Sequence, residues 1–554
     1  MKYNILYYFS FLVLLPFSLL SQEISNLTHA DSLRGNFGKE RSWWDAIYYN
    51  IDVEFSPADS SVKGTNIIGI KVLKEKFSVL QLDLQHPLQI DSIFLMGESI
   101  SKHAVIPKVD GDAYFIPIPD KLKKNKIIKL IVYYQGRPKI ASHPPWDGGT
   151  VWSKSKDGSP WISVACQGTG ASVWYPCKDH QSDEPDSATI RVTCPDSLSA
   201  ISNGRLKSCI SQKPHFKTWE WHVSVPINNY CIIPYIGKYA KFSETYFGEK
   251  GPLTMDYWVL DNNVEKAKIH FTDAPKMMKA FEYWFGPYPF YKDGYKLVQA
   301  PYLGMEHQSA VAYGNNFTKG YLGMDLSGTG WGLKWDFIII HESGHEWFAN
   351  NITTKDIADM WVHEGFTNYS EALFIEYYYG KDAANEYVRG LRASIANDEP
   401  IIGPYNVNKE GSGDMYNKGS NMIHTIRQLI HSDKKFRKML RKMNRKFGLK
   451  TVTSKEIEEF IQSYCPYSLK KVFEQYLHTI KIPVFEYRIK DHTITFLWKS
   501  CVEFFNMPLR VKLGRDKYSL IFPSVNPQVL PFNLDKPEDF KIDPNFYIQT
   551  QKDE

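Results

Sequence analysis

The chain has 554 residues, of which 43% are hydrophobic, so it can build several cores and we expect three domains. Its formal net charge at pH 7 is +5. A net positive charge this small does not suggest a polyanionic partner, which argues against nucleic-acid binding as the main function.

The first twenty-one residues are predicted to be an export signal. Lys2 precedes a short apolar stretch that Pro16 interrupts, and the small residue Ser21 stands before Gln22. This pattern is typical of a cleaved signal peptide, whereas a membrane anchor needs a longer apolar run. We therefore expect a periplasmic or extracellular protein with no stable membrane insertion after cleavage. An anchor formed by an uncleaved signal is the alternative.

Three domains are expected after the signal, in a multidomain α+β fold. In residues 22–239, short alternating runs such as NIIGIKVL and ATIRVTC predict a domain of mostly antiparallel sheet. In residues 240–481, longer amphipathic segments predict a mainly helical domain. In residues 482–554, alternation returns in FEYRI and TITFLW, which predicts a small β-sandwich-like domain.

The segment HESGHEWF holds a candidate metal site. His341 and His345 are four residues apart, so on a helix both imidazoles project from one face and can bind one ion. Eighteen residues separate His345 from Glu364, enough for a second helix to fold back and supply a third ligand. Three protein ligands and one open position are the catalytic arrangement of zinc, so we expect one Zn²⁺ per chain, although these ligand types accept other divalent ions. Glu371 lies on the same helical face as Glu364 and is expected to hydrogen-bond a ligand histidine.

Glu342, beside the first ligand, is the predicted general base. Zinc lowers the pKa of a bound water from about 15.7 to about 7, so a nucleophile exists at neutral pH. Glu342 can take the proton of that water and return it to a leaving amine. Because the metal supplies the nucleophile, none of the seven cysteines is expected to be catalytic. An exported chain could pair some of them, but the odd number leaves at least one without an intramolecular partner.

A basic segment, KKFRKMLRKMNRKF at residues 434–447, invites a nucleic-acid or membrane interpretation. Apolar residues recur in it at helical spacing and predict a buried stripe of Phe436, Met439, Leu440, Met443 and Phe447. We therefore interpret the basic residues as the solvated face of an amphipathic helix.

Further motifs carry a resemblance to a known family. They are GMEHQ at residues 304–308, Tyr416-Asn417-Lys418-Gly419, and CQGTGASVWYPCKDHQSDEP at residues 166–185. With the zinc segment, they resemble the gluzincin aminopeptidases, the family of aminopeptidase N and leukotriene hydrolase, in the family's order over roughly residues 40–480. The resemblance implies a thermolysin-like catalytic domain. It also implies that Tyr416 donates a hydrogen bond to the oxyanion, and that Glu306 and Gln167 hold the terminal ammonium beside Gly304 and Met305.

The sequence departs from the family in three places. His307 stands where the family motif has Asn, so we expect altered contact with the substrate backbone and weaker ammonium binding when this imidazole is protonated. His363 stands where Asn is common, ahead of Glu364. The larger family members carry a long C-terminal helical domain that this chain is too short to contain, so a more open cleft is expected.

The predicted function is therefore zinc aminopeptidase, with peptides that have a free N-terminus as substrates. A zinc endopeptidase is the nearest alternative, because it shares the same machinery and only Glu306 and Gln167 argue for end recognition. Epoxide hydrolysis occurs in one branch of the family, but the missing helical domain counts against it. A non-catalytic peptide-binding scaffold is the alternative outside enzymology.

Overall fold

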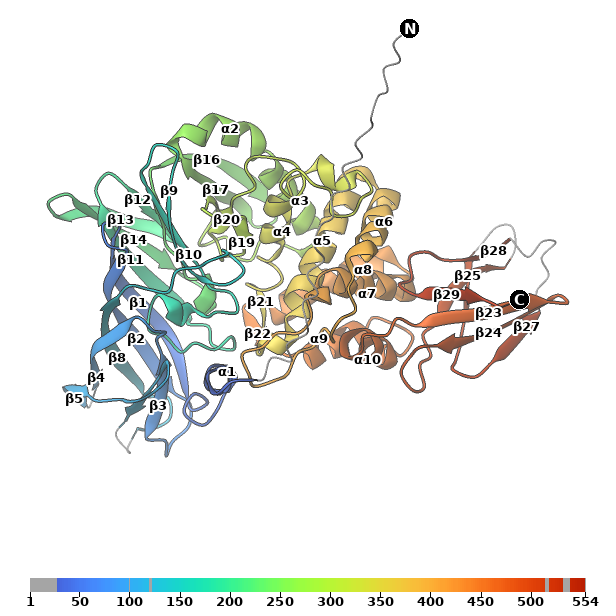
Figure 1. Ribbon diagram of the computed structural model, residues 1–554, viewed down its shortest axis with the longest axis horizontal. Coiled ribbons are helices and arrows are strands. Elements are labelled where there is room, and N and C mark those ends of the chain that lie inside the picture. The colour runs from blue at the N-terminus through green and yellow to red at the C-terminus, as the bar shows by residue number, and fades with distance from the viewer. Residues whose placement is uncertain (1–26, 99, 119–121, 514–517, 532–538, 554) are drawn as a thin grey trace, which may run out of the picture.

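The computed structural model describes residues 27–98, 100–118, 122–513, 518–531 and 539–553. Three regions follow one another along its longest axis: strands of the first part of the chain, then helices, then a smaller group of C-terminal strands (Figure 1). The predicted α+β fold class is confirmed. The predicted signal, residues 1–21, lies outside the described residues.

The N-terminal region is dominated by an eight-stranded sheet in the order β13-β14-β11-β1-β2-β8-β4-β5. Neighbouring strands are antiparallel except β1 and β11. Alternate residues of β1 point inward, so that Tyr49, Ile51, Val53 and Phe55 are buried. The strands are β1 (Trp44–Ser56), β2 (Ser61–Val72), β4 (Gln89–Gly97), β5 (Ile100–Val105), β8 (Ile127–Gly136), β11 (Ser187–Pro195), β13 (Arg205–Lys213) and β14 (Phe216–Val223).

Two smaller sheets complete this region. One has the order β12-β15-β10-β9 and the other β3-β7-β6. Their strands are β3 (Val79–Asp83), β6 (Lys108–Asp110), β7 (Ala113–Pro117), β9 (Gly149–Lys154), β10 (Pro160–Ala165), β12 (Ser199–Ile201) and β15 (Tyr235–Gly237). A short helix, α1 (His29–Gly35), precedes them.

The middle region opens with a five-stranded sheet in the order β16-β17-β18-β20-β19. The sequence predicted mainly helix here, and the sheet is an addition to that prediction. Its inner strands are buried on both faces and therefore show no alternation, as all five residues of β18 illustrate. The strands are β16 (Tyr239–Gly248), β17 (Gly251–Leu260), β18 (Tyr295–Gln299), β19 (Gly304–Met305) and β20 (Val311–Tyr313).

Helices form the rest of the middle region, together with the parallel pair β21 (Ile352–Thr354) and β22 (Lys450–Val452). They are α2 (Val264–His270), α3 (Asp273–Phe285), α4 (Phe337–Gly344), α5 (Trp361–Tyr379), α6 (Lys381–Gly390), α7 (Asn417–Ile430), α8 (Asp433–Phe447), α9 (Ser454–Gln462) and α10 (Lys470–His478). The five apolar residues predicted to form the stripe of α8 are all buried, which confirms the amphipathic helix.

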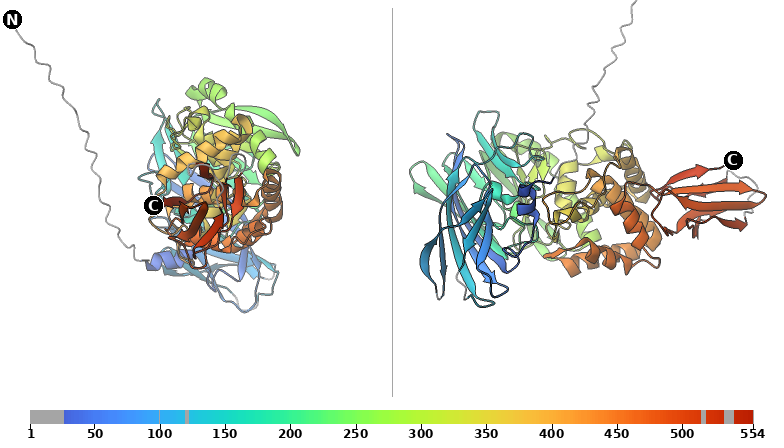
Figure 2. Two further views of the ribbon diagram at one scale, coloured as in Figure 1. Left: turned by 90° about the vertical axis from the view of Figure 1, so that its right-hand side faces the viewer. Right: turned by 60° about the horizontal axis from the view of Figure 1, so that its bottom comes forward.

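The C-terminal strands form a four-stranded sheet, β27-β24-β23-β29, and a three-stranded sheet, β26-β25-β28. They project from the helical region on the side away from the N-terminal strands (Figure 2). Hydrogen bonds from Tyr547 N to Thr425 Oγ1 and from Val502 N to Gln475 Oε1 join the two regions. The strands are β23 (Val484–Lys490), β24 (Thr493–Lys499), β25 (Leu509–Leu513), β26 (Tyr518–Ile521), β27 (Gln528–Pro531), β28 (Phe540–Ile542) and β29 (Gln549–Lys552).

The domain boundaries predicted at residues 239 and 481 stay predictions, although β16 begins at Tyr239 and β23 at Val484. All seven cysteines fall within the described residues, and each is a free thiol. No helix among those residues has the length and apolarity needed to cross a bilayer.

Two histidines that are not candidate metal ligands are held neutral, the partly buried His180 and the buried His424. His180 donates from Nε2 to the carbonyl of Gly35 and accepts at Nδ1 from the backbone N–H of Ser182, which leaves no site for a second proton. Burial, with Arg41 nearby, lowers the pKa of His180 to about 3. Burial, with Arg427 nearby, likewise lowers the pKa of His424 to about 3.

These histidines make the fold sensitive to acid. The unfolded histidine pKa is about 6.5, so between about pH 6.5 and pH 3 the unfolded state binds more protons and stability falls with falling pH. From pH 7 to pH 5 each of these two histidines should lower the free energy of unfolding by about 2 kcal/mol. Denaturant unfolding at both pH values should show that His180→Gln removes about 2 kcal/mol of this pH dependence. Replacing the exposed His492 by Gln is the control, and equal effects of the two substitutions would contradict the explanation.

Candidate metal centre and active site

The first two candidate ligands lie at the C-terminal end of a short buried helix. The side chain of Asp336 caps α4 by accepting a hydrogen bond from the backbone N–H of Ile339 at 3.1 Å. The helix ends at Gly344, and His345 is its C-cap residue. A Cβ at Gly344 would lie 2.6 Å from Ser370 Oγ on α5, so glycine here allows the two helices to approach closely.

Close packing of α4 on α5 brings the three predicted ligands together. Oε2 of Glu364 lies 3.3 Å from Nε2 of His345 and 3.8 Å from Nε2 of His341. One donor atom from each residue lies within 4.8 Å of the other two. All three side chains are buried, and Oε2 of Glu364 has no hydrogen-bond partner among the described residues.

The other ring nitrogens fix the tautomers of both histidines. Nδ1 of His341 donates to Oε1 of Glu371 at 2.7 Å, and Nδ1 of His345 donates to the carbonyl of Phe348 at 3.0 Å. A neutral imidazole with its proton on Nδ1 keeps the Nε2 lone pair free, which is the form that binds a metal. Two imidazole nitrogens and a carboxylate oxygen that otherwise lacks a partner fit a divalent metal ion such as zinc.

Electrostatics at the site favour a cation. Burial acts to lower the pKa of His345, but the carboxylates of Glu364 and Glu306 outweigh it and raise the pKa to about 9. His341 behaves in the same way, since its contacts with Glu364 and Glu371 raise its pKa well above the usual value. Buried carboxylates thus outnumber the cationic groups around the donor atoms, and a bound dication would balance them.

Glu342 lies in the same cavity as the ligands. Burial raises the pKa of its carboxyl to about 7, and Glu306 and Glu364 act in the same direction against the two histidines. A Cβ at Gly304 would lie 2.5 Å from Oε1 of Glu342, so the backbone of β19 approaches this carboxylate as only glycine allows. The sequence predicted Gly304 as a substrate contact, and the structure shows that it also leaves room for Glu342.

Glu306 follows β19, which is an edge strand of the five-stranded sheet. It is 2% exposed, and its Oε1 accepts hydrogen bonds from Gln167 Nε2 at 2.6 Å and Tyr230 Oη at 2.9 Å. The Gln167 amide also reaches Oε1 of Glu364 at 3.3 Å. Gln167 and Tyr230 come from the N-terminal strand region, so two regions of the fold meet at this carboxylate.

Tyr416 lies across the cavity, at the N-terminal end of α7. Its ring stacks on that of His341 with centroids 6.0 Å apart. Burial and four carboxylates, Glu364 foremost, raise the pKa of Tyr416 well above its usual value. The phenol therefore stays protonated and can act as a hydrogen-bond donor at neutral pH.

A cleft of about 950 Å³ contains most of the predicted site. Its walls include every predicted residue except His307 and Glu371, namely Gln167, Gly304, Met305, Glu306, His341, Glu342, His345, Glu364 and Tyr416. Arg34, Lys139 and Trp146 line it from the N-terminal region. Of the residues that shape the site, sequence reasoning missed Tyr230, because no motif surrounds it.

The expectation for His307 was wrong in one respect. The side chain is fully buried and does not line the cleft, and burial lowers its pKa to about 3. Tyr235 donates its hydroxyl proton to the carbonyl of Ala310, so Nδ1 of His307 is the donor in the 2.6 Å contact with Tyr235 Oη. Protonation of His307 near neutral pH is therefore not expected to affect ammonium binding. His363 is also buried, and its Nε2 accepts from the backbone N–H of Thr354 at 2.9 Å.

Comparisons with known proteins found similar sequences and a similar fold. Residues 270–476 match the Peptidase family M1 domain. Leukotriene A-4 hydrolase of Xenopus laevis is 25% identical over 325 residues, or 55% of this chain and 50% of that protein. Endoplasmic reticulum aminopeptidase 1 of Homo sapiens is 20% identical over 398 residues, or 69% of this chain and 41% of that protein. The chain thus spans half or less of these curated relatives.

A solved structure supports the same fold. The M1 zinc metallopeptidase from Deinococcus radiodurans superposes with a TM-score of 0.68 at 18% identity, covering 82% of this chain and 98% of that one. A structure of a mutant of that protein, described as bound to a Tyr-ser-ala substrate, has a TM-score of 0.66 at 18% identity and covers 78% and 94%. The predicted resemblance to the gluzincin aminopeptidases is confirmed.

Glu371 offers a test of the metal site that does not need activity. Its carboxylate accepts from His341 Nδ1 and from the hydroxyl of Tyr387. Replacing it by Gln removes the charge that orients and polarises His341, and should lower affinity for Zn²⁺ by about 10- to 100-fold in a chelator competition titration. Tyr387→Phe should have a smaller effect because it leaves the carboxylate in place. An unchanged affinity in Glu371→Gln would contradict the assignment.

Proposed function

We propose that the protein is a zinc-dependent aminopeptidase that removes N-terminal residues from peptides. The buried Glu306 carboxylate beside the candidate metal ligands carries this proposal. A carboxylate at this depth is suited to the ammonium group of a peptide's first residue, and the distance from it to the metal site would set where the bond is cut. On the strength of residues 1–21, we also propose that the protein acts outside the cytoplasm.

His341, His345 and Glu364 would hold the zinc ion. Bound there, zinc would supply Lewis acidity and make a water nucleophilic at neutral pH. The names of the relatives support this part of the proposal, because they include an aminopeptidase and an M1 zinc metallopeptidase.

Glu342 would move the proton. It lines the cleft next to His341, and its pKa of about 7 suits a group that must both accept and release a proton near neutral pH. It would take a proton from the attacking water and deliver it to the nitrogen of the departing amine, which then leaves as the shortened peptide.

Glu306, Gln167 and Tyr416 would position the substrate. The two hydrogen bonds to Oε1 of Glu306 hold its carboxylate in place, and Gln167 links it to Glu364. Tyr416 faces these groups from α7 and would donate to the carbonyl oxygen as negative charge develops on it. Met305 would contact the first side chain from the adjoining wall.

Glu306→Ala tests end recognition. Removing the carboxylate leaves the substrate ammonium unpaired in a buried site, so kcat/KM on amino-acid amides should fall about 100-fold or more. Glu399→Ala removes an exposed glutamate that does not line the cleft and should change the rate little. An N-acetylated peptide should not be cleaved by either variant or by the native enzyme. Cleavage of that blocked peptide would instead indicate an endopeptidase.

Tyr416→Phe tests the oxyanion donor. Loss of one such donor should lower kcat by about 100- to 1,000-fold while zinc content and KM change little. Tyr321→Phe is the matched control, because Tyr321 lines the same cleft.

Glu342→Gln tests the general base. It should lower kcat by about 100-fold at least, with zinc content retained. Activity that survived in both Tyr416→Phe and Glu342→Gln would refute the assigned roles.

A further inference from the structure

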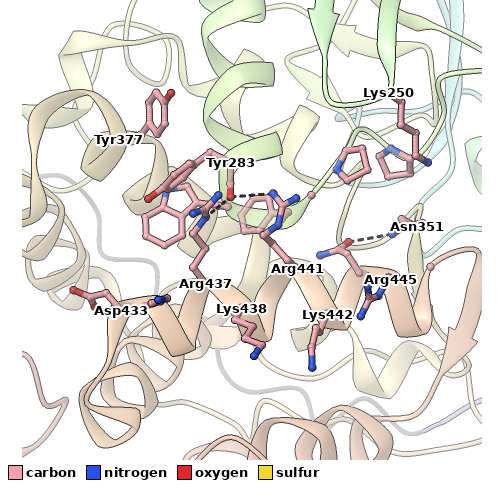
Figure 3. Close-up of a pocket in the computed structure, with 18 of the residues that line it drawn as sticks. Lys250, Tyr283, Asn351, Tyr377, Asp433, Arg437, Lys438, Arg441, Lys442 and Arg445 are labelled. Atoms are coloured by element: carbon pink, nitrogen blue, oxygen red, sulfur yellow. Dashed lines mark hydrogen bonds between the residues drawn. The ribbon is translucent and has the colours of Figure 1, made fainter.

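A second concavity, larger than the cleft, lies beside α8. Its volume is about 1340 Å³ against about 950 Å³ for the cleft, and the two share no lining residue among the described ones. We call it the α8 groove. It is bounded by α8, by the C-terminal end of α3 with the following turn at Pro287 and Pro289, and by the β16–β17 hairpin at Lys250. Figure 3 shows these elements around it.

Positive charge dominates the α8 groove. Its lining cations are Lys250, Lys434, Arg437, Lys438, Arg441, Lys442 and Arg445. Its two carboxylates, Glu376 and Asp433, are both already paired with Arg427 from α7. Of the seven cations, Arg441 alone has an ion pair recorded among the described residues, with Glu249 at 2.6 Å.

Six lining cations thus have no carboxylate partner within the described part of the chain. The whole sequence has a formal net charge of only +5, so positive charge is concentrated at this groove. Like charges held this close repel one another and attract an anionic ligand. A concave surface focuses the field of these charges on a bound ligand.

Arg437 and Arg441 are held against the C-terminal end of α3 by hydrogen bonds to its backbone carbonyls. Arg437 lies over the ring of Tyr283 at 3.5 Å and donates to its backbone carbonyl at 2.6 Å. In Figure 3, Arg437 and Arg441 point toward Tyr283, and Lys438 and Lys442 point away from it. Tyr283 is 39% exposed and, with the two prolines, supplies an apolar strip beside the cations.

These features favour one class of ligand. A flat bilayer cannot follow a concave surface to its floor. Single-stranded nucleic acid binds by stacking bases on open aromatic rings, but Tyr283 is already engaged by Arg437 and by the ring of Tyr377 at 5.3 Å. An extended acidic peptide is thin enough to follow the α8 groove and can pair its carboxylates with the cations that line it.

We propose that the α8 groove docks an acidic segment of a partner polypeptide. From Lys434 to Arg445 the helix rises about 17 Å, which about five extended residues would span. The site is separate from the cleft, so the proposal does not depend on peptidase activity.

The probe is a fluorescently labelled, N-acetylated peptide of about eight alternating Glu and Asp residues, followed by fluorescence anisotropy with the native chain. The acetyl group keeps the probe from being an aminopeptidase substrate. Binding should weaken steeply as salt rises from about 0.01 M to about 0.15 M, because the Debye length falls from about 30 Å to about 8 Å.

The groove variant is Lys438→Glu, Lys442→Glu, Arg445→Glu, and the control is Lys74→Glu, Lys207→Glu, Lys266→Glu, which changes the net charge equally at exposed sites elsewhere. Neither touches the buried stripe of α8, and circular dichroism checks that both fold. The groove variant should bind the probe at least about tenfold more weakly, and the control should match the native chain.

Other outcomes overturn the proposal. Equal loss in both variants would show that only net charge matters. No measurable binding at low salt would remove the acidic peptide as a ligand. If phosphatidylglycerol vesicles or an oligothymidylate displaced the probe and bound more tightly, with the loss again specific to the groove variant, the surface would serve a membrane or a nucleic acid instead.

Discussion

The burial of Glu364 between two imidazoles is the constraint on which the rest of the site depends. A carboxylate oxygen without a hydrogen-bond partner is expensive inside a protein, and here it faces Nε2 of His341 and Nε2 of His345. A cation at that point satisfies all three groups at once. The close approach of α4 and α5 at Gly344 creates this geometry, so the candidate metal site depends on the packing of these two helices.

Hydrogen bonds from surrounding elements hold the candidate ligands and Glu306 in position. Glu371 and the carbonyl of Phe348 hold the imidazoles in the metal-binding tautomer. Gln167 then connects Glu364 to Glu306, whose other donor is Tyr230. Since Gln167 and Tyr230 belong to the strand region and Glu364 to α5, the contact between these regions would fix where a peptide's terminus lies in the proposed aminopeptidase. The strand region is therefore part of the site as well as a scaffold.

The parts of this site that sequence could predict are those set by local geometry. Spacing of four residues placed His341 and His345 on one face, and spacing of seven placed Glu371 near the ligands. Tyr230 could not be predicted, because its contact with Glu306 spans 76 residues and has no pattern of its own. His307 was misjudged for a related reason, since the sequence shows a neighbour of Glu306 but not that its ring turns toward Tyr235. The short buried strands β19 and β20 escaped prediction because buried strands lack alternation.

The α8 groove shows how a helix can be predicted correctly while its role is not. Periodicity identified the buried stripe, and the remaining basic residues were assigned to solvent. Whether such a face is convex or concave depends on what packs beside it, here the end of α3 and the β16–β17 hairpin, which lie more than a hundred residues earlier in the chain. The modest net charge does not reveal this basic groove, because the carboxylates around the candidate metal ligands and the cations along α8 cancel in the sum. Two surfaces of opposite charge on one chain can bind two different parts of a polypeptide, an ammonium terminus at one and an acidic segment at the other.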